Sequence, residues 1–268
     1  MYGMGVSRMG SVGGVPSLAA QIAAMFGQGQ QGAWYDPSDF TTLFQDSAGT
    51  TPVTAFGQPV GLMRDKSGRG NHASQATAAS RPTLRQDAGG RYYLEFDGVD
   101  DSMATAAINF SASDKITIWT GARNNVAGMV AELSANAGLN AGAFYLYAGS
   151  DAGFNGWNSL ATGTAAVSAT QSAGVNVSMP DTAVLSISHD IAGSLSTIRR
   201  NSVAGTSGVG AKGTGNFGNY PLFIGRRGGA SAPFNGNMYS LIIRGTASSA
   251  SEIVATERYV ASKTGVTL

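Results

Sequence analysis

The stretch of residues 92–103 constrains the fold of this chain more than any other segment. Tyr92, Leu94 and Phe96 alternate with more polar positions, which is the period-two pattern of a β-strand with one buried face. Asp97-Gly98 follows at once, and an aspartate that bonds its own backbone beside a glycine that accepts positive φ is typical of a tight turn. The stretch therefore predicts a strand, a turn and a return path into an antiparallel sheet.

The same alternation recurs along the chain at fairly even spacing, bounded each time by Gly, Asn, Asp or Ser. Many short strands separated by turns favour a two-sheet antiparallel sandwich. Composition agrees, because 38 glycines and only 12% charged residues describe a chain with many turns and a polar surface of uncharged side chains. The alternating segments are residues 116–118, 144–146, 185–187, 195–198, 222–224 and 239–243.

Two helices are expected at the ends of the chain. Residues 17–26 form one, capped by Ser17 and stopped by Gly27. A capping box that starts at Ser249 begins the second, which ends at Gly265 and which we expect to pack on the sandwich edge.

The chain divides into an N-terminal arm, residues 1–33, and a sandwich domain, residues 34–268. The apolar residues of the arm make one narrow stripe, too small to form a core by itself. A flexible tail and an arm that docks on another subunit are the two alternatives, and we favour the docked arm. The stripe consists of Leu18, Ile22, Met25 and Phe26.

Bulk properties exclude several classes of protein. The net charge is only +1 and the basic residues are scattered, so the sequence offers no basic patch of the kind that binds nucleic acid. With no cysteine there is no disulfide, thiolate metal site or cysteine nucleophile. No apolar run approaches the ~20 residues of a membrane helix. The first residues fit a secretory signal poorly, so we expect synthesis in the cytosol.

Three stretches in order resemble the concanavalin A-like, laminin-G-like jelly roll, over about residues 34–265. The resemblance implies an all-β, two-sheet antiparallel β-sandwich. The resemblance is narrowed by segments 34–39, 43–46, 65–72 and 81–82, which are similar to the version of this domain found in tailed-bacteriophage virion proteins. That version implies an oligomeric structural or adhesion module of tail, baseplate, fibre or capsid surface. The stretches are Asp65-Lys66-Ser67-Gly68-Arg69-Gly70-Asn71-His72, Leu94-Glu95-Phe96-Asp97-Gly98-Val99-Asp100-Asp101, and Phe223-Ile224-Gly225 followed by residues 234–243.

Candidate catalytic residues are few. Glucanases of this superfamily need paired carboxylates, and their Glu-x-Asp-x-x-Glu strand is absent here. His189-Asp190 has the form of a base and its orienting group, but His189 shares the face of Leu185 and Ile187, so we expect a core or rim histidine. We predict that the protein is not an enzyme.

Two binding sites remain as candidates. Asp97, Asp100 and Asp101 offer hard oxygen ligands for calcium, as in some relatives, although an Asx turn with solvated charges is the favoured alternative, and no other cofactor is expected. Tyr145 and Tyr147 share a strand face. With Asn155 and Trp157 from the following Gly-rich loop they would bind a glycan, unless these aromatics pack between sheets or subunits.

The sequence thus predicts a non-enzymatic structural protein of a tailed-phage virion, assembled in the host cytoplasm. It would be a homo-oligomer that contacts other virion proteins through the arm and mediates attachment to the host surface. The alternative is a lectin-like module that binds a host surface glycan, dependent on calcium if the three aspartates hold the ion. Neither role involves nucleic acid or membrane insertion.

Overall fold

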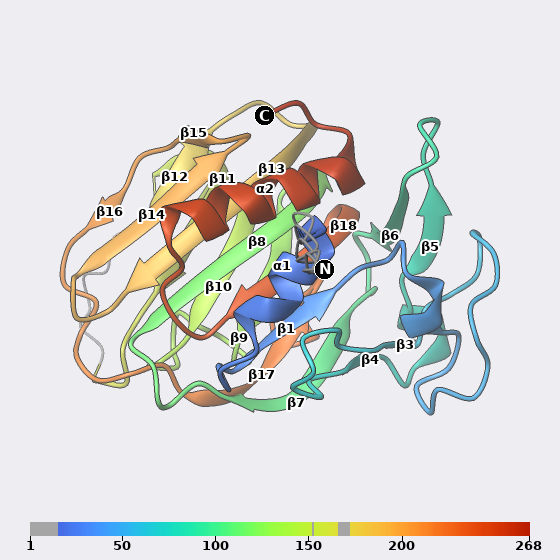
Figure 1. Cartoon of the computed structure of the whole chain (residues 1–268), viewed down its shortest axis with the longest axis horizontal. Helices are drawn as coiled ribbons and strands as arrows, with labels where there is room; N and C mark the ends of the chain where they lie inside the picture. The colour runs from blue at the N-terminus through green and yellow to red at the C-terminus, as the bar shows by residue number, and fades with distance from the viewer. Residues whose placement is uncertain (1–15, 152, 166–171) are drawn as a thin grey trace, which may run out of the picture.

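The structure, a computed structural model, describes residues 16–151, 153–165 and 172–268. These residues form two antiparallel sheets packed face to face, with two helices over the outer side of one sheet (Figure 1). We call the sheet beneath the helices sheet A and the other sheet B. The predicted two-sheet β-sandwich with a C-terminal helix is confirmed.

Sheet A is organised around β18, which pairs with β8 along one edge and with β6 and β1 in turn along the other. Its strand order is β15-β14-β13-β8-β18-β6-β5, and β16 pairs with β14. The bounds are β1 (Gly32–Tyr35), β5 (Thr83–Gln86), β6 (Tyr92–Asp97), β8 (Lys115–Asn124), β13 (Asp181–Asp190), β14 (Leu195–Arg200), β15 (Val203–Ala204), β16 (Gly208–Val209) and β18 (Asn235–Arg244).

Sheet B has the order β12-β11-β10-β9-β17-β7-β4-β3-β2. Its strands are β2 (Leu43–Phe44), β3 (Leu62–Met63), β4 (Ala73–Ser74), β7 (Met103–Asn109), β9 (Gly128–Leu133), β10 (Phe144–Asp151), β11 (Phe154–Ala161), β12 (Ala173–Asn176) and β17 (Asn219–Ile224). The helices are α1 (Leu18–Met25) and α2 (Ala250–Thr264), with 3₁₀ turns η1 (Phe40–Thr42) and η2 (Ala78–Ser80).

The main core lies between the sheets and follows the predicted alternation. Leu94 and Phe96 of β6 are buried, and the Phe96 ring lies 6.0 Å from that of Phe234, centroid to centroid. Phe144 and Leu146 of β10 contribute to the same core cluster from sheet B. Burial of each such side chain contributes about 1.5–3 kcal/mol, so this interior supplies most of the stability.

A second apolar cluster lies between the outer face of sheet A and the two helices. Trp34 and Trp119 from the sheet pack with Tyr259 and Val260 of α2. At Gly121 of β8 a Cβ would lie 2.4 Å from Thr264 Cγ2, so only glycine lets the helix approach this closely. We expected α2 at the sandwich edge, and that was wrong: the helix crosses the central strands β8, β13 and β18, because the outer face of sheet A is apolar (Figure 1).

Helix α1 packs in the same layer, beside α2 (Figure 1). Ile22, Met25 and Phe26 are buried against α2 and sheet A, and Leu18 is half-buried at the margin of this cluster. The stripe predicted to contact another subunit is therefore occupied within its own chain, and its anchoring role stays a prediction. Residues 1–15 of the predicted arm lie outside the described residues.

The glycine-rich motif of residues 65–72 is a structural turn. The buried Asp65 carboxylate accepts hydrogen bonds from the backbone N–H groups of Trp34 (2.9 Å), Ser67 (2.8 Å) and Asn71 (3.0 Å). The Asn71 amide in turn donates to the Gly32 carbonyl at 2.7 Å. These bonds fasten the turn to β1.

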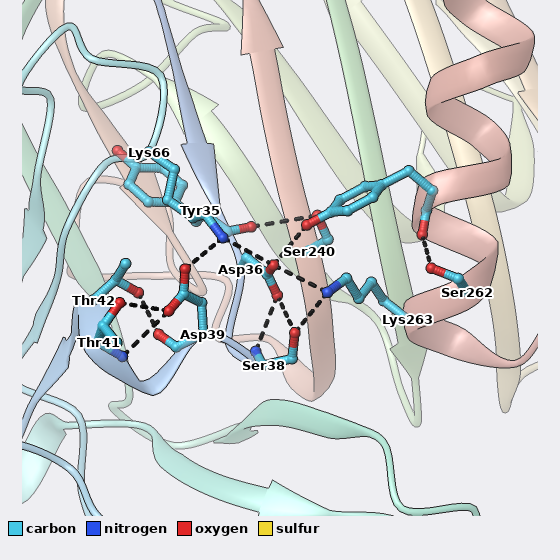
Figure 2. A network of polar contacts seen from close by, with 11 residues as sticks. Tyr35, Asp36, Ser38, Asp39, Thr41, Thr42, Lys66, Ser240, Ser262 and Lys263 are labelled. Carbon is cyan, nitrogen blue, oxygen red and sulfur yellow. Dashed lines mark hydrogen bonds and ion pairs between the residues drawn. The ribbon is translucent and has the colours of Figure 1, made fainter. Parts of the chain in front are cut away.

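Asp36 connects the segment after β1 to α2 (Figure 2). Its Oδ2 accepts a hydrogen bond from the Tyr259 hydroxyl at 2.6 Å and lies 3.1 Å from Lys263 Nζ and 3.3 Å from Lys66 Nζ. Burial alone would raise the pKa of Asp36, but Lys263, Ser38 and Tyr259 outweigh it and hold the pKa at about 2. The carboxylate is ionised and stabilises the helix layer.

Candidate functional site

The outer face of sheet B carries a pocket of about 470 Å³. Tyr145 and Tyr147 of β10 form its floor with Leu160 of β11. Both tyrosines face outward because Phe144 and Leu146, which alternate with them, fill the core. The walls consist of residues 137–141, Thr162, Arg227, Ala232, and Ser150 and Asp151 at the end of β10.

The polar groups of the pocket are held in place. The Tyr145 hydroxyl donates to Asp151 Oδ2 at 2.6 Å. Burial and this bond to a carboxylate raise the pKa of Tyr145 well above its usual value, so the phenol stays protonated at neutral pH. The Arg227 guanidinium lies 5.8 Å from the centre of the Tyr145 ring. The pocket therefore combines an aromatic floor with an acid and a cation, both next to Tyr145.

Glu132 lies behind the pocket wall and supports it. Its side chain is fully buried, and its carboxylate accepts hydrogen bonds from Arg227 Nε (3.2 Å) and from the backbone N–H of Ala137 (2.6 Å). Burial raises the pKa of Glu132 despite these two partners. The glutamate thus fixes both the cation and the start of the 137–141 wall, a role that the isolated residue in the sequence did not reveal.

The four residues predicted to bind a glycan do not all meet. Tyr145 and Tyr147 lie together in the pocket, and Asn155 is exposed in an adjoining hollow that shares Ser150 and Asp151 with it. Trp157 requires a correction. It belongs to β11, is fully buried between the sheets, and its indole N–H donates to Asp181 Oδ2 at 2.7 Å. Inward-facing positions of β11 pair with those of β10, so Trp157 points away from the pocket.

The predicted calcium ligands do lie together. One carboxylate oxygen from each of Asp97, Asp100 and Asp101 falls within 4.8 Å of the others. Asp97 Oδ1 accepts a hydrogen bond from the N–H of Val99 at 2.7 Å, and Asp100 Oδ2 accepts one from the Ser80 hydroxyl at 2.7 Å. Burial and the charge of Asp97 raise the pKa of Asp101 to about 6. The cluster has the local bonds of an Asx turn, and calcium binding stays a prediction.

His189 is a core residue, as the alternation predicted. Its ring is fully enclosed between Ser159 Oγ (2.9 Å) and Ser196 Oγ (2.6 Å). Burial lowers the pKa of His189 to about 3, so the imidazole is neutral. No helix in the described ranges has the length and apolar character required to cross a bilayer.

Comparison with known proteins identifies a shared fold. No protein-family model matches the chain, and no curated protein matches it in sequence. Domain 4 of a GH43 extracellular arabinanase from Geobacillus stearothermophilus, solved with arabinotriose, is similar with a TM-score of 0.55 and 12% identity over 84% of this chain and 97% of that domain.

Two larger proteins contain a similar unit. A GH54 α-L-arabinofuranosidase soaked with a cyclic sulfate inhibitor gives a TM-score of 0.60 at 14% identity, covering 92% of this chain and 66% of that one. Botulinum neurotoxin type C, whose cell entry depends on two ganglioside molecules, gives 0.56 at 11% identity, covering 90% and 52%. The chain thus spans only part of these two proteins, and at such identities the likeness establishes a shared β-sandwich fold.

Proposed function

We propose that this protein is a carbohydrate-binding module whose binding site is the pocket over Tyr145 and Tyr147. The observation that carries the proposal is the pocket itself: an aromatic floor with Asp151 and Arg227 fixed at its sides. Sugar rings have apolar faces that stack on aromatic rings and hydroxyls that bond to charged side chains. The similar structures solved with arabinotriose or linked to gangliosides support the same class of ligand.

Binding without hydrolysis fits the two carboxylates near the pocket. Glycoside hydrolysis uses a pair of carboxyl groups that flank the scissile bond and exchange protons with substrate and water. Glu132 is fully buried and accepts hydrogen bonds from Arg227 and Ala137, while Asp151 accepts a hydrogen bond from the Tyr145 hydroxyl. Neither group is placed as an acid and base pair, so we propose that the module is not itself an enzyme.

A glycan array that includes arabinotriose and ganglioside oligosaccharides tests the proposal. Tyr147→Ala removes a half-buried ring from the pocket floor and should weaken binding about two- to twelvefold, because ring stacking contributes about 0.5–1.5 kcal/mol. Tyr93→Ala is the matched control, since Tyr93 packs on Tyr239 in sheet A. Equal glycan binding by the Tyr147 variant and the wild type would place the site elsewhere, and an array on which the wild type binds nothing would refute the proposal.

We propose, second, that the module is carried on a tailed-phage virion, where glycan binding would serve host attachment. The order of the segments at residues 34–39, 43–46, 65–72 and 81–82 supports this context, which rests on the sequence resemblance alone. Homo-oligomer formation and contacts with other virion proteins belong to the same proposal. Antibody labelling of purified particles tests it, since a protein absent from intact particles would rule the virion role out.

A further inference from the structure

A second hollow of about 940 Å³ adjoins the pocket along the β10–β11 hairpin. The two share Ser150 and Asp151 in their linings, so they adjoin at the end of β10. Phe154, Asn155, Asn176 and Ser178 line the far part. Pockets for ligands of ordinary small-molecule size are about 300–1,000 Å³, and the first pocket alone is in this range. The combined groove therefore has room for a longer ligand than one sugar unit.

Phe154 gives the second hollow an aromatic platform. Its half-buried ring lies against the backbone of Gly174 on the neighbouring strand β12, where a Cβ would lie 2.3 Å from Phe154 Cγ. Any other residue at position 174 would displace the ring. The ring is thereby held against the strand, and Phe154 lines the hollow, as Tyr147 lines the first pocket.

Two amide side chains, those of Asn155 and Asn176, line the same hollow with their donors available. The backbone N–H of Asn155 donates to Asn176 Oδ1 at 2.8 Å, and the Ser150 hydroxyl donates to Asn155 Oδ1 at 3.0 Å. These bonds use the amide oxygens and fix both side chains. Neither amide nitrogen donates a hydrogen bond to any residue that the structure describes, and both side chains are exposed. They can donate to ligand hydroxyls.

The charges of the groove select against acidic sugars. Arg227 is the cation of the first pocket, and the buried Glu132 behind it already offsets its charge. Asp151 stands where the two hollows meet. A sialic acid or uronic acid unit placed there would meet a like charge, and the described residues that line the two hollows include no further cation to compensate it.

We infer that the second hollow is a second sugar subsite, so that the ligand is a neutral oligosaccharide lying along the β10–β11 hairpin from Tyr147 to Phe154. This inference rests on the proposed function, because it assumes that the first pocket binds a sugar. The second subsite makes the affinity depend on the length of the oligosaccharide, since only an oligomer reaches both aromatic platforms.

Titration calorimetry with arabinose, glucose and galactose oligomers of one to four units tests the subsite. Wild-type affinity should rise from one unit to the longer oligomers. Phe154→Ala should lower the affinity for the longer oligomers roughly three- to tenfold and leave the single unit unchanged. Phe56→Ala is the matched control, because Phe56 is 58% exposed and lines neither hollow.

Asn176→Asp is a second variant that keeps the acceptor for the Asn155 N–H and removes the amide donor, and it should act on the longer oligomers in the same way. Unchanged affinity of both variants for every length, with Tyr147→Ala still impaired, would overturn the subsite and leave the proposed function standing. Failure of the wild type to bind any length would overturn both. Tighter binding of sialylated than of neutral oligomers would overturn the assignment to a neutral ligand.

Discussion

The outer faces of the two sheets each hold a fully buried glutamate, and the two are stabilised to different degrees. Glu257 of α2, above sheet A, accepts hydrogen bonds from Arg199 Nε (2.7 Å) and from the hydroxyls of Ser186 (2.6 Å) and Ser202 (2.7 Å). Burial alone would raise the pKa of Glu257, but these donors outweigh it and lower the pKa. Glu132 on sheet B has two donors, Arg227 and Ala137, and burial leaves its pKa raised.

This difference separates the face that carries the helices from the face that carries the candidate pocket. On sheet A the buried charge has enough donors to stabilise the fold, and it fastens the helix that covers the sheet. On sheet B the two donors of Glu132 do not offset the effect of burial, so the buried charge costs stability, yet it holds Arg227 at the pocket. Local rules are commonly violated in this way where a site must be positioned.

Glu257→Gln should have the largest effect on stability. The amide keeps the shape but loses the charge and brings a donor toward groups that are themselves donors, so we expect the free energy of unfolding at pH 7 to fall by about 3 kcal/mol. Chemical denaturation of the variant and the wild type measures this. A loss below about 1 kcal/mol would contradict a structural role for this carboxylate.

The same pair of proteins gives a pH test. The folded state binds a proton at Glu257 less readily than the unfolded state, whose pKa is near the ordinary 4.5. The stabilisation is therefore complete above that value and is lost as the pH falls below it. The difference between wild type and variant should shrink from pH 7 toward pH 3, and a constant difference would show that shape rather than charge matters.

Glu132→Gln should change the free energy of unfolding less than Glu257→Gln does. The amide oxygen still accepts from the Ala137 N–H, and the cost of the buried charge disappears along with the Arg227 pair, so we expect a change within about 1 kcal/mol at pH 7. The pH dependence has the opposite sign to that of Glu257. Because the pKa of Glu132 is raised in the folded state, protonation stabilises the folded protein, so the free energy of unfolding of the wild type should rise relative to that of the variant as the pH falls. A loss as large as that of Glu257→Gln would remove the distinction between the two faces.

Much of the fold follows from the hydrophobic periodicity of the sequence and from its turn and capping residues. The alternation at Leu94 and Phe96, the capping box at Ser249 and the inward position of His189 all agree with the structure, because each is a local pattern with a definite geometric consequence. Trp157 was misplaced because Asn and Gly around it are poor strand formers, and the pairing of β11 with β10 and β12 overrides that preference.

The site was harder to predict than the fold. Tyr145 and Tyr147 were identifiable because two aromatics share one strand face. Arg227, Glu132 and Phe154 were not, since they come from separate strands and loops that only the sheet order brings together. The apolar stripe of α1 was visible, but its partner was not, because a stripe at helical spacing does not specify which surface it covers.

The aspartates at and after the end of β6 should give the smallest effect, because they are held by a local turn. Asp97 Oδ1 accepts from the N–H groups of Val99 (2.7 Å) and Asp100 (3.2 Å), a role that asparagine can also fill. Asp97→Ala should therefore cost about 1 kcal/mol and Asp97→Asn much less, equally in calcium and in chelator. A calcium ion needs the charge that Asp97→Asn removes. If calcium stabilises the wild type and leaves both variants unaffected, the three aspartates are a metal site whose ion offsets their repulsion.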